Sequence, residues 1–307
     1  MSVDGLPPLR EVITRHGLGA DKRFGQHFLM DLNLTAKIAR LCGDMSAASV
    51  IEVGPGPGGL TRALLSEGAG EVIAVERDSR FLPALEEIGA ASGGRLTVIE
   101  ADALKMNELD AETRFSSVML ASNLPYNIGT ALLIKWLTSD PLWWSRLVLM
   151  FQKEVAERVV ARPGDGAYGR LAILTAAVAS ARYAFTVPAR AFTPPPKVDS
   201  AVVVLDPLPA EARFADLEGL SRVTESAFGQ RRKTLRKSLG LAAGQAGVRS
   251  EALLDAAGLD GGARAETIAP EGFFRLAQAW RAARLWRSIL RRQPCESQGN
   301  SDRRSTR

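Results

Sequence analysis

Short apolar runs alternate with helix-like segments from residue 49 onward. The runs are SVIEV, EVIAVE, RLTVIE, FSSVMLA and RLVLMFQ, which begin at residues 49, 71, 95, 115 and 146. Between the first two runs, Leu60, Leu64 and Leu65 fall on one face of a predicted helix. Continuous β-rich runs separated by helices are typical of a parallel sheet that is covered on both faces.

Two further strands are predicted near 182–187 and 198–205, joined by the proline-rich segment VPARAFTPPPK. This segment is too short to hold a crossover helix, so we expect the two strands to run antiparallel. The pattern therefore predicts an α/β domain over residues 1–205, built on a seven-stranded, mostly parallel, Rossmann-like sheet.

The pattern changes after residue 206. Helical spacing of apolar residues recurs in segments 213–228, 230–239, 250–257 and 270–290, and no strand is predicted among them. We therefore expect a smaller, all-helical domain over 206–290. The last stretch, 291–307, is polar and poor in apolar residues, which predicts a disordered tail.

The composition excludes several classes of protein. The chain has 307 residues, of which 46% are hydrophobic and 24% charged, as in ordinary globular proteins. Its apolar runs are shorter than a membrane span, and no secretory signal is recognisable at the start. Two cysteines and two histidines cannot build a disulfide framework or a multi-histidine metal site. We expect a cytoplasmic protein with no membrane contact and no structural metal.

Positive charge is concentrated in the C-terminal third. Residues 206–307 carry 18 Lys and Arg against 12 Asp and Glu, whereas the first 205 residues carry 21 against 22. Five cations crowd into one predicted helix, namely Arg231, Arg232, Lys233, Arg236 and Lys237. A charge run can be a solvated face, but on a domain that holds the whole basic excess it favours contact with the phosphates of a nucleic acid.

The segment EVGPGPGG follows a predicted strand and opens a helix. Glycines such as Gly54 and Gly56 let the backbone turn tightly and let a ligand approach main-chain N–H groups. Glu76 ends the next strand, where a carboxylate can bind ribose hydroxyls. An ordinary structural turn is the alternative. The G-x-G-x-G spacing favours S-adenosylmethionine over a dinucleotide, because no pyrophosphate has to be bound at the helix N-terminus.

Two further strand ends carry polar side chains. Asp102 follows the third strand, where it could accept a hydrogen bond from the amine of an adenine or simply cap a helix. Asn123, Leu124, Pro125 and Tyr126 follow the fourth strand in the stretch ASNLPYNIGT. A plain strand-to-helix turn is the alternative for this second group.

The Asn-Leu-Pro-Tyr turn suits chemistry on a purine amine, which is a poor nucleophile because its lone pair is delocalised. The side-chain oxygen of Asn123 and the carbonyl of Leu124 could accept hydrogen bonds from both N–H protons. The nitrogen would then approach tetrahedral geometry and turn its lone pair towards a methyl donor. Pro125 holds the turn rigid, and Tyr126 could stack on a base removed from its helix.

Taken together, the sequence resembles the ribosomal RNA adenine N6-dimethyltransferases, and most closely the bacterial members that act on the small subunit. The resemblance extends from about residue 7 to 285. It rests on KRFGQHFLMD, EVGPGPGGLT, VERD, ADALK, SNLPYNIGT, QKEVAERVVARPGDGAYGRL, AFTPPPKVDSAVV and AFGQRRKTLRKSL. It implies a class I methyltransferase fold with S-adenosylmethionine as cofactor.

The resemblance also implies roles for individual residues. His27 and Leu29 would line the methionine end of the cofactor, and Phe192 would be a second aromatic beside the target base. Gly54, Glu76, Asp102 and Asn123 match the family's cofactor-binding positions. The implied substrate is a pair of adjacent adenines in the 3′-terminal hairpin of 16S rRNA, within an assembling 30S subunit, and nothing in the sequence suggests other than a monomer.

Three alternatives stay open at this point. The first is a methyltransferase of the Erm type that acts on large-subunit rRNA. The second is an assembly factor whose main task is to bind a pre-ribosomal particle. The third is a DNA adenine or protein glutamine methyltransferase that shares the Asn-x-Pro-Tyr motif.

Overall fold

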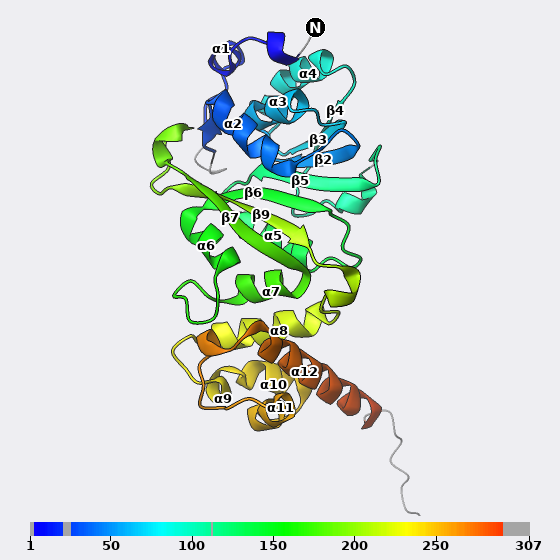
Figure 1. Ribbon diagram of the computed structural model, residues 1–307, viewed down its shortest axis with the longest axis vertical. Coiled ribbons are helices and arrows are strands. Elements are labelled where there is room, and N and C mark those ends of the chain that lie inside the picture. The colour runs from blue at the N-terminus through cyan, green and yellow to red at the C-terminus, as the bar shows by residue number, and fades with distance from the viewer. Residues whose placement is uncertain (1–2, 21–25, 112, 291–307) are drawn as a thin grey trace, which may run out of the picture. The chain divides into compact units, whose positions relative to one another are not determined.

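A computed structural model describes residues 3–20, 26–111 and 113–290 (Figure 1). The expected tail 291–307 and the first residues of the KRFGQHFLMD block lie outside the described residues. The chain divides into two compact units, Met1–Leu217 and Glu218–Arg307.

A seven-stranded sheet forms the centre of the first unit, with the order β4-β3-β2-β5-β6-β9-β7. The first five of these strands run parallel, whereas β9 pairs antiparallel with both β6 and β7. This confirms the predicted mostly parallel α/β sheet. The strands are β2 (Ala48–Val53), β3 (Glu71–Glu76), β4 (Leu96–Glu100), β5 (Ser117–Asn123), β6 (Arg146–Gln152), β7 (Ala179–Val187) and β9 (Ser200–Pro207).

Seven α-helices accompany the sheet in the described part of this unit. They are α1 (Leu9–Arg15), α2 (Leu32–Ala39), α3 (Gly59–Ser66), α4 (Leu82–Ala91), α5 (Gly129–Leu137), α6 (Lys153–Val160) and α7 (Arg170–Val178). α3 packs on β3 and α4 on β4, while α6 packs on β6, β7 and β9. Strands β2 and β3 are buried along their whole length, as expected for the centre of a parallel sheet.

A second, two-stranded sheet was not predicted. β1 (Phe28–Leu29) pairs antiparallel with β8 (Phe192–Thr193), so that Leu29 lies opposite Phe192. Strands of two residues leave no periodic signal in the sequence. Their pairing nevertheless links the segment around His27 to the proline-rich segment that precedes β9.

The first unit extends past the last strand. The Leu208 N–H donates to the Val178 carbonyl, and the Phe214 N–H donates to the Ala177 carbonyl, both at 2.8 Å. These bonds tie the segment after β9 to the end of α7. The contacts therefore divide the chain after Leu217, later than the expected boundary at 205.

The second unit is helical, as predicted, with α8 (Leu217–Phe228), α9 (Leu235–Ser238), α10 (Gly240–Ala246), α11 (Ser250–Ala257) and α12 (Pro270–Leu290). The prediction of one helix over 230–239 was wrong. α8 ends at Phe228, a turn follows, and Thr234 forms an isolated β-bridge with Arg264 before α9 begins. Thr234 has the extended backbone of a helix N-cap, which interrupts the helical path.

The core of the second unit is built around α12. Phe273, Leu276 and Trp280 are buried on one side of it, and α12 contacts α10 and α11. The Trp280 Nε1–H donates to the carbonyl of the buried residue Ala242 at 2.8 Å. No helix in the described part of the chain is long and apolar enough to cross a membrane.

Trp280→Phe should destabilise the second unit by about 2 kcal/mol, because the indole hydrogen bond to the Ala242 carbonyl is lost and the smaller ring leaves space in the core. Trp286→Phe, on the same helix but 65% exposed, is the matched control and should change the stability by less than about 0.5 kcal/mol. Urea unfolding followed by circular dichroism measures both. Equal destabilisation by the two substitutions would contradict this account of the core.

Candidate active site

A pocket of about 1080 Å³, including its open mouth, lies where β2, β3, β4 and β5 end. Because carboxyl ends of parallel strands meet at one edge, this is the expected ligand site of an open α/β sheet. The pocket brings together most of the residues that the sequence singled out. They are His27, Leu29, Gly54, Gly56, Glu76, Asp102, Asn123, Leu124, Pro125 and Tyr126.

The glycine loop after β2 packs directly on the Asn-Leu-Pro-Tyr turn. Gly54 has a φ of +68°, and a Cβ there would lie 3.3 Å from the Pro125 side chain. A Cβ at Gly59 would lie 2.9 Å from the Leu29 carbonyl. Glycine is therefore needed both for the backbone turn and for close approach between these segments.

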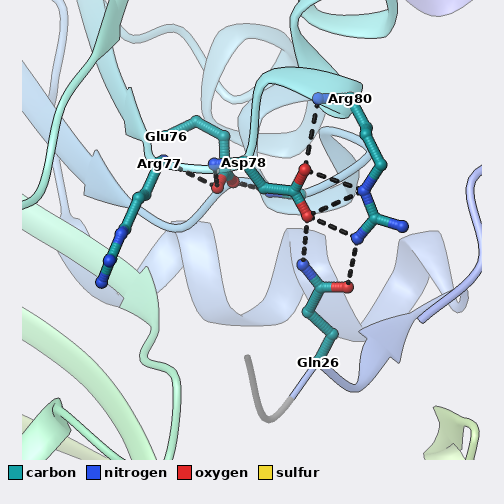
Figure 2. A network of polar contacts seen from close by, with 6 residues as sticks. Gln26, Glu76, Arg77, Asp78 and Arg80 are labelled. Atoms are coloured by element: carbon teal, nitrogen blue, oxygen red, sulfur yellow. Dashed lines mark hydrogen bonds and ion pairs between the residues drawn. The ribbon is translucent and has the colours of Figure 1, made fainter. Parts of the chain in front are cut away.

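Glu76 binds this loop from the neighbouring strand. One carboxylate oxygen accepts the Gly56 N–H at 3.0 Å, and the other accepts the N–H groups of Arg77 and Asp78 at 2.8 Å (Figure 2). Burial raises the pKa of the Glu76 carboxyl, and these hydrogen bonds act in the opposite direction. A carboxylate oxygen has two lone pairs, so the oxygen bound to Gly56 keeps capacity for a ligand hydroxyl.

A polar network beside Glu76 was not predicted. Asp78 accepts a hydrogen bond from the Gln26 amide at 2.9 Å and several from the Arg80 guanidinium (Figure 2). The Arg80 hydrogen bond lowers the pKa of Asp78 to about 2, with Gln26 contributing in the same direction. The network fixes the residue before His27 to the turn after β3. Gln26 and Asp78 both line the pocket.

Asp102 lies at the start of a turn, not of a helix, so the alternative of a helix cap is wrong. One carboxylate oxygen accepts the Leu104 N–H at 3.1 Å within this turn, and the other lies 3.4 Å from the Arg77 guanidinium. Asp102 also lines the pocket, so a ligand contact there stays a prediction.

Asn123 is oriented by the main chain of His27. Its Nδ2 donates to the His27 carbonyl at 3.3 Å. A carbonyl can only accept, so this bond assigns the amide nitrogen and leaves Oδ1 as the acceptor of the Asn123 amide. The Pro125 carbonyl accepts the N–H groups of Ile128 and Gly129, which starts α5 directly after the turn.

Tyr126 is held at the pocket wall by one polar contact and one ring contact. Its hydroxyl is 2.6 Å from Ser200 Oγ, and burial raises its pKa. The His27 ring lies beside the Tyr126 ring, with 5.4 Å between centroids. His27 Nδ1 is 2.8 Å from the Pro194 carbonyl, which can only accept, so Nδ1 is the donor of this bond.

Phe192 is placed differently from the other expected residues. Its side chain is 3% exposed within the hydrophobic core, and it is not among the residues that line the pocket. Its backbone pairing with Leu29 links it to the site. Contact with a base stays a prediction.

Glu52 is a pocket residue that the sequence reasoning missed. It lies in the buried strand β2, is 2% exposed, and accepts the Thr61 hydroxyl at 2.6 Å. Burial raises the pKa of its carboxyl to about 8, so it is protonated at neutral pH. A charged residue inside the run SVIEV was the available signal.

The basic cluster of the second unit is exposed, but it lies on two elements. Arg231, Arg232 and Lys233 occupy the turn after α8, whereas Arg236 and Lys237 belong to α9. Arg236 lies 3.7 Å from Glu251, and such an exposed pair is weak.

The sheet order, with its antiparallel β9, and the pocket at the strand ends define a Rossmann-like methyltransferase. The chain belongs to the ribosomal RNA adenine dimethylase family, whose sequence profile matches residues 18–281. The protein is therefore an rRNA adenine methyltransferase, as the motifs predicted.

Proteins that are named as rRNA methyltransferases match almost the whole chain. The ribosomal RNA small subunit methyltransferase A of Maricaulis maris (strain MCS10) is 65% identical over 283 residues, which cover 92% of this chain and 98% of the relative. The protein of the same name from Chelativorans sp. (strain BNC1) is 55% identical over 280 residues, which cover 91% of this chain and 99% of the relative.

Solved structures of related enzymes share the fold. A dimethyladenosine transferase from Plasmodium falciparum has a TM-score of 0.69 and 26% identity, with 84% of this chain and 98% of that chain covered. The 23S rRNA methyltransferase ErmE has a TM-score of 0.58 and 28% identity, with 83% of this chain and 99% of that chain covered.

Glu52→Gln should change how stability depends on pH. The folded protein keeps a proton on Glu52 that the unfolded chain releases above its ordinary pKa of 4.5. The contribution of Glu52 to the stability of the wild type is therefore fully present below about pH 4.5. It is lost, by an amount on the order of a few kcal/mol, as the pH rises to about 8. The variant cannot ionise, so its stability relative to the wild type should rise over this window.

Urea midpoints at pH 5, 7 and 9 measure this effect. Glu86→Gln, at an exposed position of α4, is the control and should keep the wild-type profile. A Glu52→Gln profile parallel to that of the wild type would show that Glu52 ionises normally.

Proposed function

We propose that this enzyme dimethylates N6 of two adjacent adenines in the 3′-terminal hairpin of 16S rRNA, within the assembling 30S subunit. The relatives named for the small ribosomal subunit are 55–65% identical, whereas ErmE, named for 23S rRNA, is 28% identical. This contrast supports the small-subunit substrate over the large-subunit alternative. Such an enzyme would work as a monomer in the cytoplasm, where subunits assemble.

We further propose S-adenosylmethionine as the methyl donor. When bound, this cofactor supplies a methyl group on a positively charged sulfonium. The pocket suits a cationic nucleoside, because four carboxyl groups line it: Glu52, Glu76, Asp78 and Asp102. Of these, Glu52 is the one that burial keeps neutral. Glu76 would bind the ribose hydroxyls and Asp102 the adenine amine, while His27 and Leu29 would line the methionine end.

The observation that carries the proposal is the orientation of Asn123. Since its Nδ2 is held by the His27 carbonyl, Oδ1 is the group available to accept from the N6 amine of the target adenine. The Leu124 carbonyl would accept the second N–H. These two bonds draw the nitrogen towards tetrahedral geometry and free its lone pair.

The other residues of the turn would hold the base. The Tyr126 ring, tethered through its hydroxyl to Ser200, offers a fixed surface for stacking. After transfer the nitrogen carries the positive charge, and its proton can leave to solvent without a dedicated base. Positioning and hydrogen bonding therefore supply most of the acceleration.

Asn123→Ala should abolish methyl transfer while leaving cofactor binding weaker but detectable, because the variant removes the acceptor for N6 and keeps most pocket contacts. Tritiated cofactor with 30S particles from an unmethylated strain measures transfer into N6-dimethyladenosine, and calorimetry measures binding. Asn33→Ala, at an exposed position of α2, is the control with expected wild-type activity. Full transfer by Asn123→Ala would overturn its role, and no label from the wild type would overturn the activity.

The basic cluster should set the salt dependence of RNA binding. Five phosphate contacts predict a log–log slope of the association constant against salt on the order of −3 to −5. Changing Arg232 and Lys233 together to Gln should make the slope about 2 less steep, because each phosphate contact contributes about one unit. Arg10→Gln, an exposed change in α1, is the control. An unchanged slope in the double variant would exclude the cluster from the interface.

A further inference from the structure

The loop after β4 is held by one lysine of α5. The Lys135 ammonium donates to the Ala103 carbonyl at 2.9 Å, to the Met106 carbonyl, and to the Glu108 carboxylate at 2.9 Å. All three acceptors belong to the same loop. A cation with three donors thus closes the loop against the helix.

Glu108 completes this arrangement from the loop side. Its carboxylate is almost fully buried, with 6% of the residue exposed, and it also accepts the Trp136 Nε1–H at 2.7 Å. Two consecutive residues of α5 therefore bind the same loop. A lysine in the apolar sequence ALLIKWL is costly to bury unless it makes such contacts.

The loop forms one wall of the pocket, which Ala101, Asp102 and Ala103 line. Its own structure is a short turn, in which the Asp102 carbonyl accepts the N–H groups of Lys105 and Met106 at 2.8 and 3.0 Å. Leu104 and Lys105 are exposed, so the turn gains little from apolar burial. Its position depends mainly on polar contacts with α5.

We propose that Lys135 is a positioning residue that holds Asp102 at the adenosine end of the cofactor pocket. α5 begins directly after the Asn123–Ile128 turn, so the same helix connects the methyl-transfer turn to the adenosine wall. The inference rests on the proposed S-adenosylmethionine site. A loop fixed before binding spares the ligand the cost of ordering it, which raises affinity.

Two effects of losing Lys135 have to be separated: the loop that carries Asp102 is no longer held, and the Glu108 carboxylate is left buried without a cation. Lys135→Met alone would leave the Glu108 carboxylate buried and unpaired, so Lys135→Met is combined with Glu108→Gln, which still accepts from Trp136. Glu108→Gln alone keeps both lysine–carbonyl bonds. Lys153→Met, a half-exposed lysine of α6, is the unrelated control.

Binding of S-adenosylhomocysteine is measured by calorimetry, and amide exchange at Lys105 and Met106 by mass spectrometry or NMR. The double variant should bind about tenfold more weakly, exchange faster at these amides, and show a raised KM for the cofactor with an unchanged kcat. Glu108→Gln and Lys153→Met should stay within about twofold of the wild type.

Wild-type affinity and exchange in the double variant would overturn the positioning role. Failure of the wild type itself to bind the nucleoside would instead overturn the proposed function. If the double variant does not fold, Lys135→Arg serves in its place, because a planar guanidinium keeps the charge beside Glu108 but cannot reproduce the ammonium's contacts. Unchanged binding by Lys135→Arg would likewise count against the proposal.

Discussion

The hydrogen bond from the Asn123 amide to the His27 carbonyl is the contact on which the site depends. It joins a segment near the start of the chain to the end of β5, and it decides which atom of the amide accepts. The His27 carbonyl is itself fixed on both sides, by the Gln26–Asp78 bond and by the pairing of β1 with β8. A single amide is thus oriented by elements far apart in the sequence.

The electrostatics of the pocket follow from how each carboxyl is buried. Glu76 is surrounded by backbone N–H groups and Asp78 by a guanidinium, so both have local donors that favour the ionised form. Glu52 has one hydroxyl donor and deep burial, which favours the neutral acid. Three acidic residues, in β2, at the end of β3 and in the turn after it, therefore differ in how burial and local donors act on their pKa values, and only the structure distinguishes them.

The sheet and most of the pocket could be predicted because parallel strands place their carboxyl ends at one edge. Gly54, Glu76, Asp102 and Asn123 were found in this way, each at the end of an apolar run. The pairing of Leu29 with Phe192 could not be predicted, because two-residue strands have no periodicity. The break at Thr234 was missed because the basic residues around it favour a helix locally, while a β-bridge to Arg264 decides the outcome.

That break has a consequence for how the family can diversify. The turn between α8 and Thr234 is exposed, and its ends are anchored, by the buried side of α8 on one side and by the bridge on the other. Insertions, deletions and changes of charge in such a turn leave the packing of the helices intact. The turn can therefore vary in length and charge while the helical core beneath it keeps its packing.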